Sequence, residues 1–402
     1  MMPDSWSFFT SGQLVFGPGS IDQLGDWFQR RQLQRVLVIT DQSLQQAGVV
    51  EPVEKQLSAA GLEFTIFAGG CAEPSLEIAD QALAETLSWK PAAVLGLGGG
   101  SNMDLAKIVA TVLSHGGKPA DYFGFDQVPG PVLPLVCVPT TAGTGSEVSH
   151  AAVLTDTENE IKVSTMSNYL RPDLALVDPV LTYSCPPQVA ADSGIDALTH
   201  AIEAYTAVDY DRMEIPAGES SSYTGRQPLG DCLSEKAITL VGQHLVNAVT
   251  DPDAHEARDA MALAATLAGM AFSNCGVALV HALEYPLGGT LHCSHGAGNG
   301  LLLPYVMRFN LPEREETMAR IAQLLGCDVS GMDQATAAAE AIRKVEELRQ
   351  AIGIPHRIRE LGGREDQLAG FAEKSFAIKR LQWVNPRASN YEDLLGILQA
   401  AF

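Results

Sequence analysis

The stretch "VLGLGGGSNMDLAK", residues 94–107, joins an apolar run, a glycine-rich turn and a helical pattern. This order predicts a buried strand, then a loop, then a helix that starts near Ser101. Backbone N–H groups in such a loop can approach a phosphate, and the positive end of the helix dipole favours an anion there. Tight strand-to-helix turns also need glycine for steric reasons alone, so both roles are open from this stretch.

Similar apolar runs bounded by turn residues recur through the first half of the chain: "RVLVIT" (35–40), "FTIFAG" (64–69), "LPLVCVPTT" (133–141) and "DLALVDP" (173–179). Helical patterns separate the first of them, which predicts a parallel sheet with helical crossovers. Farther along, these runs give way to Ala- and Leu-rich helical stretches. We therefore expect an α/β domain over residues 1–184 and an all-α domain over 185–402, with an exposed loop at 209–230 between two helices.

The composition limits the classes of partner. Asp and Glu number 48 against 26 Lys and Arg, a formal net charge of −22, which argues against nucleic acid and anionic membranes and favours a small-molecule ligand. The seven cysteines are scattered singly, as expected in a reducing compartment. The start lacks a basic and apolar leader, and no long uncharged apolar run follows, so we expect a soluble, cytoplasmic protein without a membrane span.

A second loop, "VPTTAGTGSEVS" (138–149), follows another predicted strand and offers several hydroxyl groups, those of Thr140, Thr141, Thr144 and Ser146. Two such loops at the carboxyl ends of parallel strands favour a nucleotide pocket. Asp41 ends the strand "RVLVIT", where its carboxylate can accept hydrogen bonds from ribose hydroxyls and repel a 2′-phosphate, which favours NAD over NADP. It can equally cap the helix that follows.

Candidate metal ligands lie in the second half. In "ADSGIDALTHAIEAY" (191–205), Asp196 and His200 are four residues apart and project from one helical face. Such a pair can bind one divalent ion or form a simple hydrogen bond. With His281 and His295 the set becomes three nitrogens and one oxygen, suited to Fe²⁺ or Zn²⁺ with a position open for substrate.

These motifs, with "HALEYPLGGTLHCSHGAGNGLLLPYVMRFN" (281–310), resemble the group III, iron-containing alcohol dehydrogenases over nearly the whole chain. The resemblance implies a dehydroquinate synthase-like architecture, with a Rossmann-like parallel-sheet domain, a helical domain, and a cleft between them for metal and nicotinamide. It implies that iron, or zinc, binds to Asp196, His200, His281 and His295. It also implies that NAD contacts Asp41, Gly99, Gly100, Ser101, Asp104, Thr140, Thr141, Thr144 and Lys162. We expect a homodimer or higher homo-oligomer.

This sequence departs from the family pattern at three positions. Tyr285 stands where the family often has a second histidine, Ser294 replaces a usual proline, and Glu73 replaces an asparagine of many members. The substituted histidine is a proposed proton-handling group in the family. We therefore take Tyr285 and His292 as the candidate side chains for moving the hydroxyl proton.

The predicted reaction is metal-assisted hydride transfer between NAD(H) and a small primary alcohol, diol or hydroxy acid. The Tyr-Pro pair at 285–286 and the loop ending in "YTGRQPLGD" also resemble the hydroxyacid-oxoacid transhydrogenase branch of the family. A transhydrogenase with tightly bound nicotinamide is thus one alternative. A lyase on the dehydroquinate synthase-like scaffold is the other.

Overall fold

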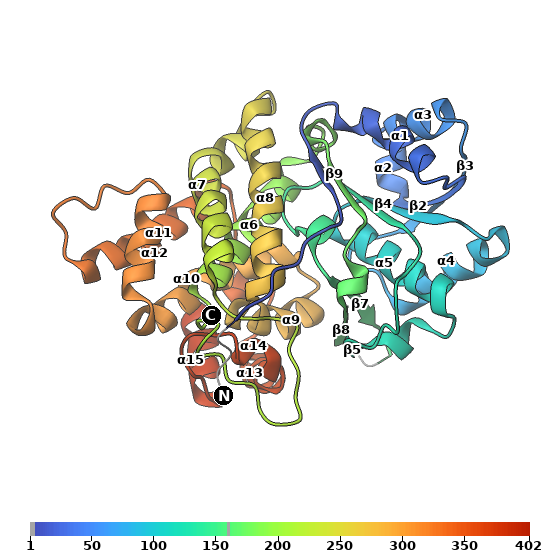
Figure 1. The fold of residues 1–402 in the computed structure, drawn as a ribbon. Coiled ribbons are helices and arrows are strands. Elements are labelled where there is room, and N and C mark those ends of the chain that lie inside the picture. The colour runs from blue at the N-terminus through green and yellow to red at the C-terminus, as the bar shows by residue number, and fades with distance from the viewer. Residues whose placement is uncertain (1–4, 159–160) are drawn as a thin grey trace. The chain divides into compact units, whose positions relative to one another are not determined.

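The computed structural model describes residues 5–158 and 161–402, and the chain divides into two compact units (Figure 1). One unit is Phe9–Cys185. The other is Pro186–Phe402 together with the described residues before Phe9.

The Phe9–Cys185 unit is built on a six-stranded parallel sheet with the order β1-β9-β6-β4-β2-β3. Its strands are β1 (Leu14–Phe16), β2 (Arg35–Asp41), β3 (Glu63–Gly70), β4 (Ala93–Gly98), β6 (Leu135–Pro139) and β9 (Leu174–Val177). All five strands expected from the apolar runs are present, and β1 adds an edge strand. The predicted α/β class with a parallel sheet is confirmed.

Both faces of this sheet are covered, because successive residues of a strand point to opposite sides. Val36 and Val38 of β2 belong to a core with α1 (Leu24–Arg30) and α3 (Glu51–Ala59). Their neighbours Leu37 and Ile39 belong to a second core with α4 (Leu76–Thr86) and α5 (Gly100–His115). The continuous apolar runs in the sequence are thus explained by burial on two sides.

A smaller sheet has the order β5-β8-β7, with β5 (Gly124–Phe125) parallel to β8 (Ile161–Met166) and β8 antiparallel to β7 (Ala151–Asp156). β7 and β8 lie outside the strands predicted from the sequence. The short helix α2 (Gln42–Gln46) follows β2.

The second unit is helical, as predicted, and its described residues contain no β-strand. Its helices are α6 (Pro187–Thr206), α7 (Pro228–Thr250), α8 (His255–Cys275), α9 (Leu279–Leu291), α10 (His295–Asn310), α11 (Glu315–Leu324), α12 (Gln334–Ala351), α13 (Leu368–Ala377), α14 (Lys379–Gln382) and α15 (Tyr391–Ala401). Helices α6, α7 and α8 each pack against the other two and form a bundle (Figure 1).

The prediction of an exposed loop over 209–230 is correct only for its middle. Residues 214–220 are exposed, but Tyr223 is buried and residues 228–230 form the first turn of α7. Two arginines anchor the ends: Arg314 donates to Asp209 at 3.1 Å, and Arg226 donates to Asp231 at 2.9 Å. Sequence composition missed this because the anchoring partners lie outside the loop.

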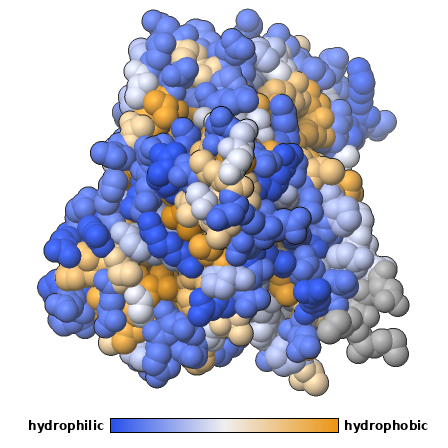
Figure 2. Space-filling view, turned by 90° about the vertical axis from the view of Figure 1, so that its left-hand side faces the viewer, coloured by the Kyte–Doolittle hydropathy of each residue, from blue (hydrophilic) through white to orange (hydrophobic). Residues whose placement is uncertain are grey.

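Across the described residues, no single helix is long and apolar enough to cross a membrane. The bent pair α8 and α9, with an angle of 105° between them, passes the same test of length and composition. On the face that Figure 2 shows, hydrophilic residues predominate and hydrophobic residues form small, separate patches.

Candidate functional site

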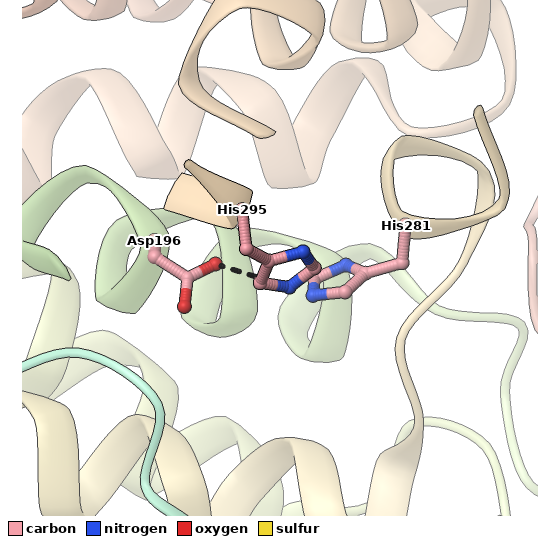
Figure 3. A group of neighbouring side chains, drawn as sticks. All are labelled: Asp196, His281 and His295. Carbon is pink, nitrogen blue, oxygen red and sulfur yellow. Dashed lines mark ion pairs between the residues drawn. The ribbon is translucent and has the colours of Figure 1, made fainter. Parts of the chain in front are cut away.

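The proposed ligands meet inside the helical unit. Helix α6 presents Asp196 and His200 one turn apart, and their side chains are almost fully buried. His281 lies in the first turn of α9, and His295 is the first residue of α10. One ligand atom from each of Asp196, His281 and His295 lies within 4.8 Å of the others. Figure 3 shows these three side chains pointing toward one another.

His200 joins the same cluster. Its Nε2 atom lies 3.1 Å from Nε2 of His281, and its ring stacks on Phe272 with the centroids 4.2 Å apart. Its other nitrogen, Nδ1, is buried, has no hydrogen-bond partner among residues 5–158 and 161–402, and lies 3.7 Å from Asp196 Oδ2. All four side chains predicted as metal ligands therefore converge.

Two buried glutamates contact the outer nitrogens of these imidazoles. Glu203 Oε2 lies 2.6 Å from His281 Nδ1, and Glu284 Oε2 lies 2.5 Å from His295 Nδ1. A carboxylate accepts hydrogen bonds, so each Nδ1 carries a proton and each Nε2 keeps its lone pair for the centre of the cluster. This carboxylate–histidine arrangement is the usual support of a metal-binding histidine.

Burial and neighbouring groups shift the pKa values of two side chains in the cluster, His200 and Asp196. Burial lowers the pKa of His200 to about 4, although Asp196 opposes the shift, so this imidazole is neutral at pH 7. Burial alone would raise the pKa of Asp196, but the nearby imidazoles and the Asn299 amide outweigh it and lower that pKa. An ionised carboxylate and neutral imidazoles are the forms that bind a metal.

The donor set therefore fits a divalent ion. Three imidazole nitrogens and one carboxylate suit iron or zinc. In the described structure, either tautomer of His200 leaves one of its buried nitrogens without a suitable partner. A cation among the three Nε2 atoms would accept their lone pairs.

The two proton-transfer candidates differ in their surroundings. The half-buried ring of Tyr285 lies 6.2 Å from the ring of His295 and 6.4 Å from that of His281, measured between centroids. His292 is exposed at the C-terminal cap of α9, with a left-handed φ of 52°. Among the described residues, no hydrogen bond or ring contact joins His292 to the cluster.

In the other unit, the glycine-rich loop leads from β4 into α5 as predicted. Gly98 has a φ of +143°, which L side chains rarely adopt, and an added Cβ on Gly100 would lie 2.8 Å from the Thr144 side chain. The two loops are therefore in contact. The N-cap of α5, Gly99, has no side chain to cap the helix. The Asn102 and Met103 N–H groups donate to the Gly99 carbonyl, so an anion at this end would meet the N–H groups of Gly100 and Ser101.

The turn before α4 supports the same loop. Glu73 donates its backbone N–H to Ser101 Oγ at 3.1 Å, and its carboxylate pairs with Lys162 of β8 at 2.9 Å. Glu73 adopts a left-handed φ of 53°, a conformation that asparagine accepts more readily than glutamate. Lys162 and Glu73 therefore form an ion pair between β8 and the turn before α4.

Asp41 caps the N-terminus of α2, which is one of the two roles expected for it; the other was ribose binding. One carboxylate oxygen accepts the Leu44 N–H at 3.0 Å and the Ser43 hydroxyl, and the other accepts the Asn102 amide at 2.7 Å. A carboxylate has about four acceptor positions, so these bonds leave room for a further donor.

Asp104 and Ser146, both predicted to contact the cofactor, bind each other at 2.6 Å. Asp104 also accepts the Val153 N–H, and the fully buried Lys107 donates to Ser146 at 2.8 Å. Burial lowers the pKa of Lys107, while Asp104 opposes the shift. These contacts hold the second loop against α5.

The sequence matches the "Iron-containing alcohol dehydrogenase" profile over residues 11–179. It matches "Fe-containing alcohol dehydrogenase family, C-terminal" over residues 190–402. The chain belongs to the iron-containing alcohol dehydrogenase family. The prediction of an iron-type alcohol dehydrogenase is thus confirmed.

Three relatives illustrate this iron-containing dehydrogenase family. The NAD-dependent methanol dehydrogenase of Bacillus methanolicus is 34% identical over 395 residues, covering 98% of this chain and 99% of the relative. The crystal structure of 1,3-propanediol oxidoreductase has a TM-score of 0.92 at 33% identity, covering 99% and 100% of the two chains. Sulfoacetaldehyde reductase from Bifidobacterium kashiwanohense, in complex with NAD+, has a TM-score of 0.85 at 26% identity and covers 99% of each. None of the three is a transhydrogenase or a lyase, so neither alternative gains support.

Three side chains that contact the proposed metal ligands were not predicted from the sequence: Glu203, Glu284 and Asn299. Each had a local signal. Glu203 lies seven residues after Asp196 on the same face of α6, Glu284 lies three residues after His281, and Asn299 lies four after His295. Helical spacing from a known ligand could have found all three.

Proposed function

We propose that this enzyme transfers a hydride between NAD(H) and a small primary alcohol, diol or hydroxy acid. Asp196, His200, His281 and His295 would hold an iron or zinc ion. When bound, the ion supplies a Lewis acid for the substrate oxygen, and the nicotinamide supplies or accepts the hydride.

One observation carries this proposal. Three imidazoles and one carboxylate converge in a buried cluster, and glutamates hold two of the imidazoles with their Nε2 lone pairs turned inward. So costly an arrangement of buried polar groups is explained by a bound cation.

The cofactor would bind to the other unit. The dipole of α5 and the backbone of its glycine loop favour the diphosphate. The contacting residues would be Asp41, Gly99, Gly100, Ser101, Thr140, Thr141, Thr144 and Lys162, with Asp104 and Ser146 keeping the second loop in place. For the hydroxyl proton we favour Tyr285, because its ring lies beside two of the proposed ligands whereas His292 is exposed.

The test begins with protein stripped of metal by a chelator and reloaded with Fe²⁺ or Zn²⁺. We expect about one ion per chain and NADH formation with added NAD and alcohols. The screen should span methanol, diols, hydroxy acids and long-chain alcohols. His281→Ala should lose both metal and activity, whereas His244→Ala, on α7 and outside the cluster, should keep both. Full activity in His281→Ala would reject the proposed metal site.

The proposal also covers the oligomeric state and the cellular location of the enzyme. We expect a homodimer or higher homo-oligomer in the cytoplasm. Light scattering on the purified, full-length protein measures the oligomeric state directly.

A further inference from the structure

We propose that Asn299 is a positioning residue of the metal centre, which holds the Asp196 carboxylate in place for the ion. Asn299 lies on α10, one turn after His295, and is fully buried. Its Nδ2 atom lies 2.8 Å from Asp196 Oδ1, 3.1 Å from His295 Nε2 and 3.2 Å from His281 Nε2. The inference rests on the proposed metal ligands.

The three atoms that surround this amide nitrogen are all acceptors. The Nδ1 atoms of His281 and His295 face the Glu203 and Glu284 carboxylates, which places the proton of each neutral imidazole on Nδ1 and leaves Nε2 as an acceptor. An amide NH₂ group has two hydrogens and cannot satisfy three acceptors. Once the imidazole lone pairs face an ion, Asp196 Oδ1 is the acceptor that remains for Asn299.

The opposite end of the amide supports a functional role. Asn299 Oδ1 is buried and has no hydrogen-bond partner among the described residues. Rotating the amide would point this oxygen at three other acceptors, so the acceptors fix the orientation in which Nδ2 faces the cluster. A buried oxygen without a partner is costly, and such costs are retained where they serve a site.

This geometry gives Asn299 a defined task. With one oxygen of Asp196 bound to the amide, the carboxylate cannot rotate freely, and its position relative to the three imidazoles is set before an ion arrives. Residues that orient metal ligands in this way typically change metal affinity by about 10- to 100-fold when they are removed.

The experiment measures Zn²⁺ affinity of the full-length, metal-stripped protein by competition with a chromophoric chelator. Asn299→Leu keeps the branched shape of the side chain and removes the hydrogen bond, and Asn299→Ser removes it with a smaller side chain. We expect both to bind Zn²⁺ about 10- to 100-fold more weakly. The visible spectrum of the Co²⁺-loaded variants should also differ from that of the wild type, because the carboxylate is no longer held.

Asn310→Ala is the matched control. Asn310 is also a buried asparagine of α10, but it bonds to Asn385 rather than to the cluster. This control should keep wild-type Zn²⁺ affinity and the Co²⁺ spectrum. Affinity and spectrum unchanged in both Asn299 variants would overturn the inference while leaving the metal site intact. A wild-type protein that binds no ion would instead refute the proposed function.

Discussion

At the scale of single residues, Tyr285 is one of three positions where the sequence departs from the family pattern, and it is the one beside the proposed metal ligands. Tyr285→Phe removes one hydroxyl and keeps the ring that packs near His281 and His295. If the hydroxyl moves the substrate proton, turnover at neutral pH should fall by about 100-fold, the lower end of general acid–base effects. NADH affinity and metal content should stay the same.

Tyr305→Phe is the control for this experiment, because the Tyr305 hydroxyl bonds to a backbone carbonyl, that of His356. Steady-state rates across a pH series measure both variants. An unchanged pH–rate profile for Tyr285→Phe would mean that the hydroxyl does not transfer the proton and that the ring only packs against its neighbours.

At the scale of elements, the turn before α4 and the β7–β8 hairpin meet at the Glu73–Lys162 pair. Glu73→Asn removes a negative charge beside Lys162 and the proposed diphosphate site, and it suits the left-handed backbone at this position. We expect NADH to bind about three- to fivefold more tightly, which is the upper end of the effect of one partly exposed charge. Fluorescence titration with NADH measures the change.

Glu77→Gln is the matched control for charge. Glu77 lies nearby on α4 and accepts a hydrogen bond from Thr157 instead of pairing with Lys162. Its substitution should leave NADH affinity within about twofold of the wild type. Equal effects of the two substitutions would mean that only overall charge matters and that the pair has no specific role.

At the scale of the whole molecule, the fold should be sensitive to acid. His150 is buried in the Phe9–Cys185 unit, and burial, with Arg171 and Lys107, lowers its pKa well below 6.5. Below pH 6.5 the unfolded chain binds a proton here that the folded protein does not. The free energy of unfolding should therefore fall by up to about 1.4 kcal/mol per pH unit.

Denaturant unfolding at pH 7.5 and pH 5.5 checks this, with His150→Asn beside the wild type. The variant lacks the titrating group, so it should lose about 1 kcal/mol less than the wild type between these two conditions. Equal losses would mean that His150 does not drive the acid sensitivity.

Most of the fold could be predicted because the spacing of apolar residues along the sequence indicates which side of a strand or helix is buried. The runs that became β2, β3, β4, β6 and β9 are mostly apolar, and the regular elements of the second half are helices. β7 and β8 escaped prediction because polar residues stand among the apolar ones, as in "IKVSTM" of β8, and because only alternate residues of β7 are buried. The loop at 209–230 was misjudged in part because Arg314, which anchors Asp209, lies 105 residues away.

The sequence by itself indicated the four side chains that converge, since helical spacing puts Asp196 and His200 on one face and the resemblance to the dehydrogenase family adds His281 and His295. Only the tertiary structure decided what surrounds them. Glu203 reaches His281 across 78 residues, and Asn299 reaches Asp196 across 103. Spacing along a helix fixes which side chains share a face, but contacts between helices depend on how those faces pack.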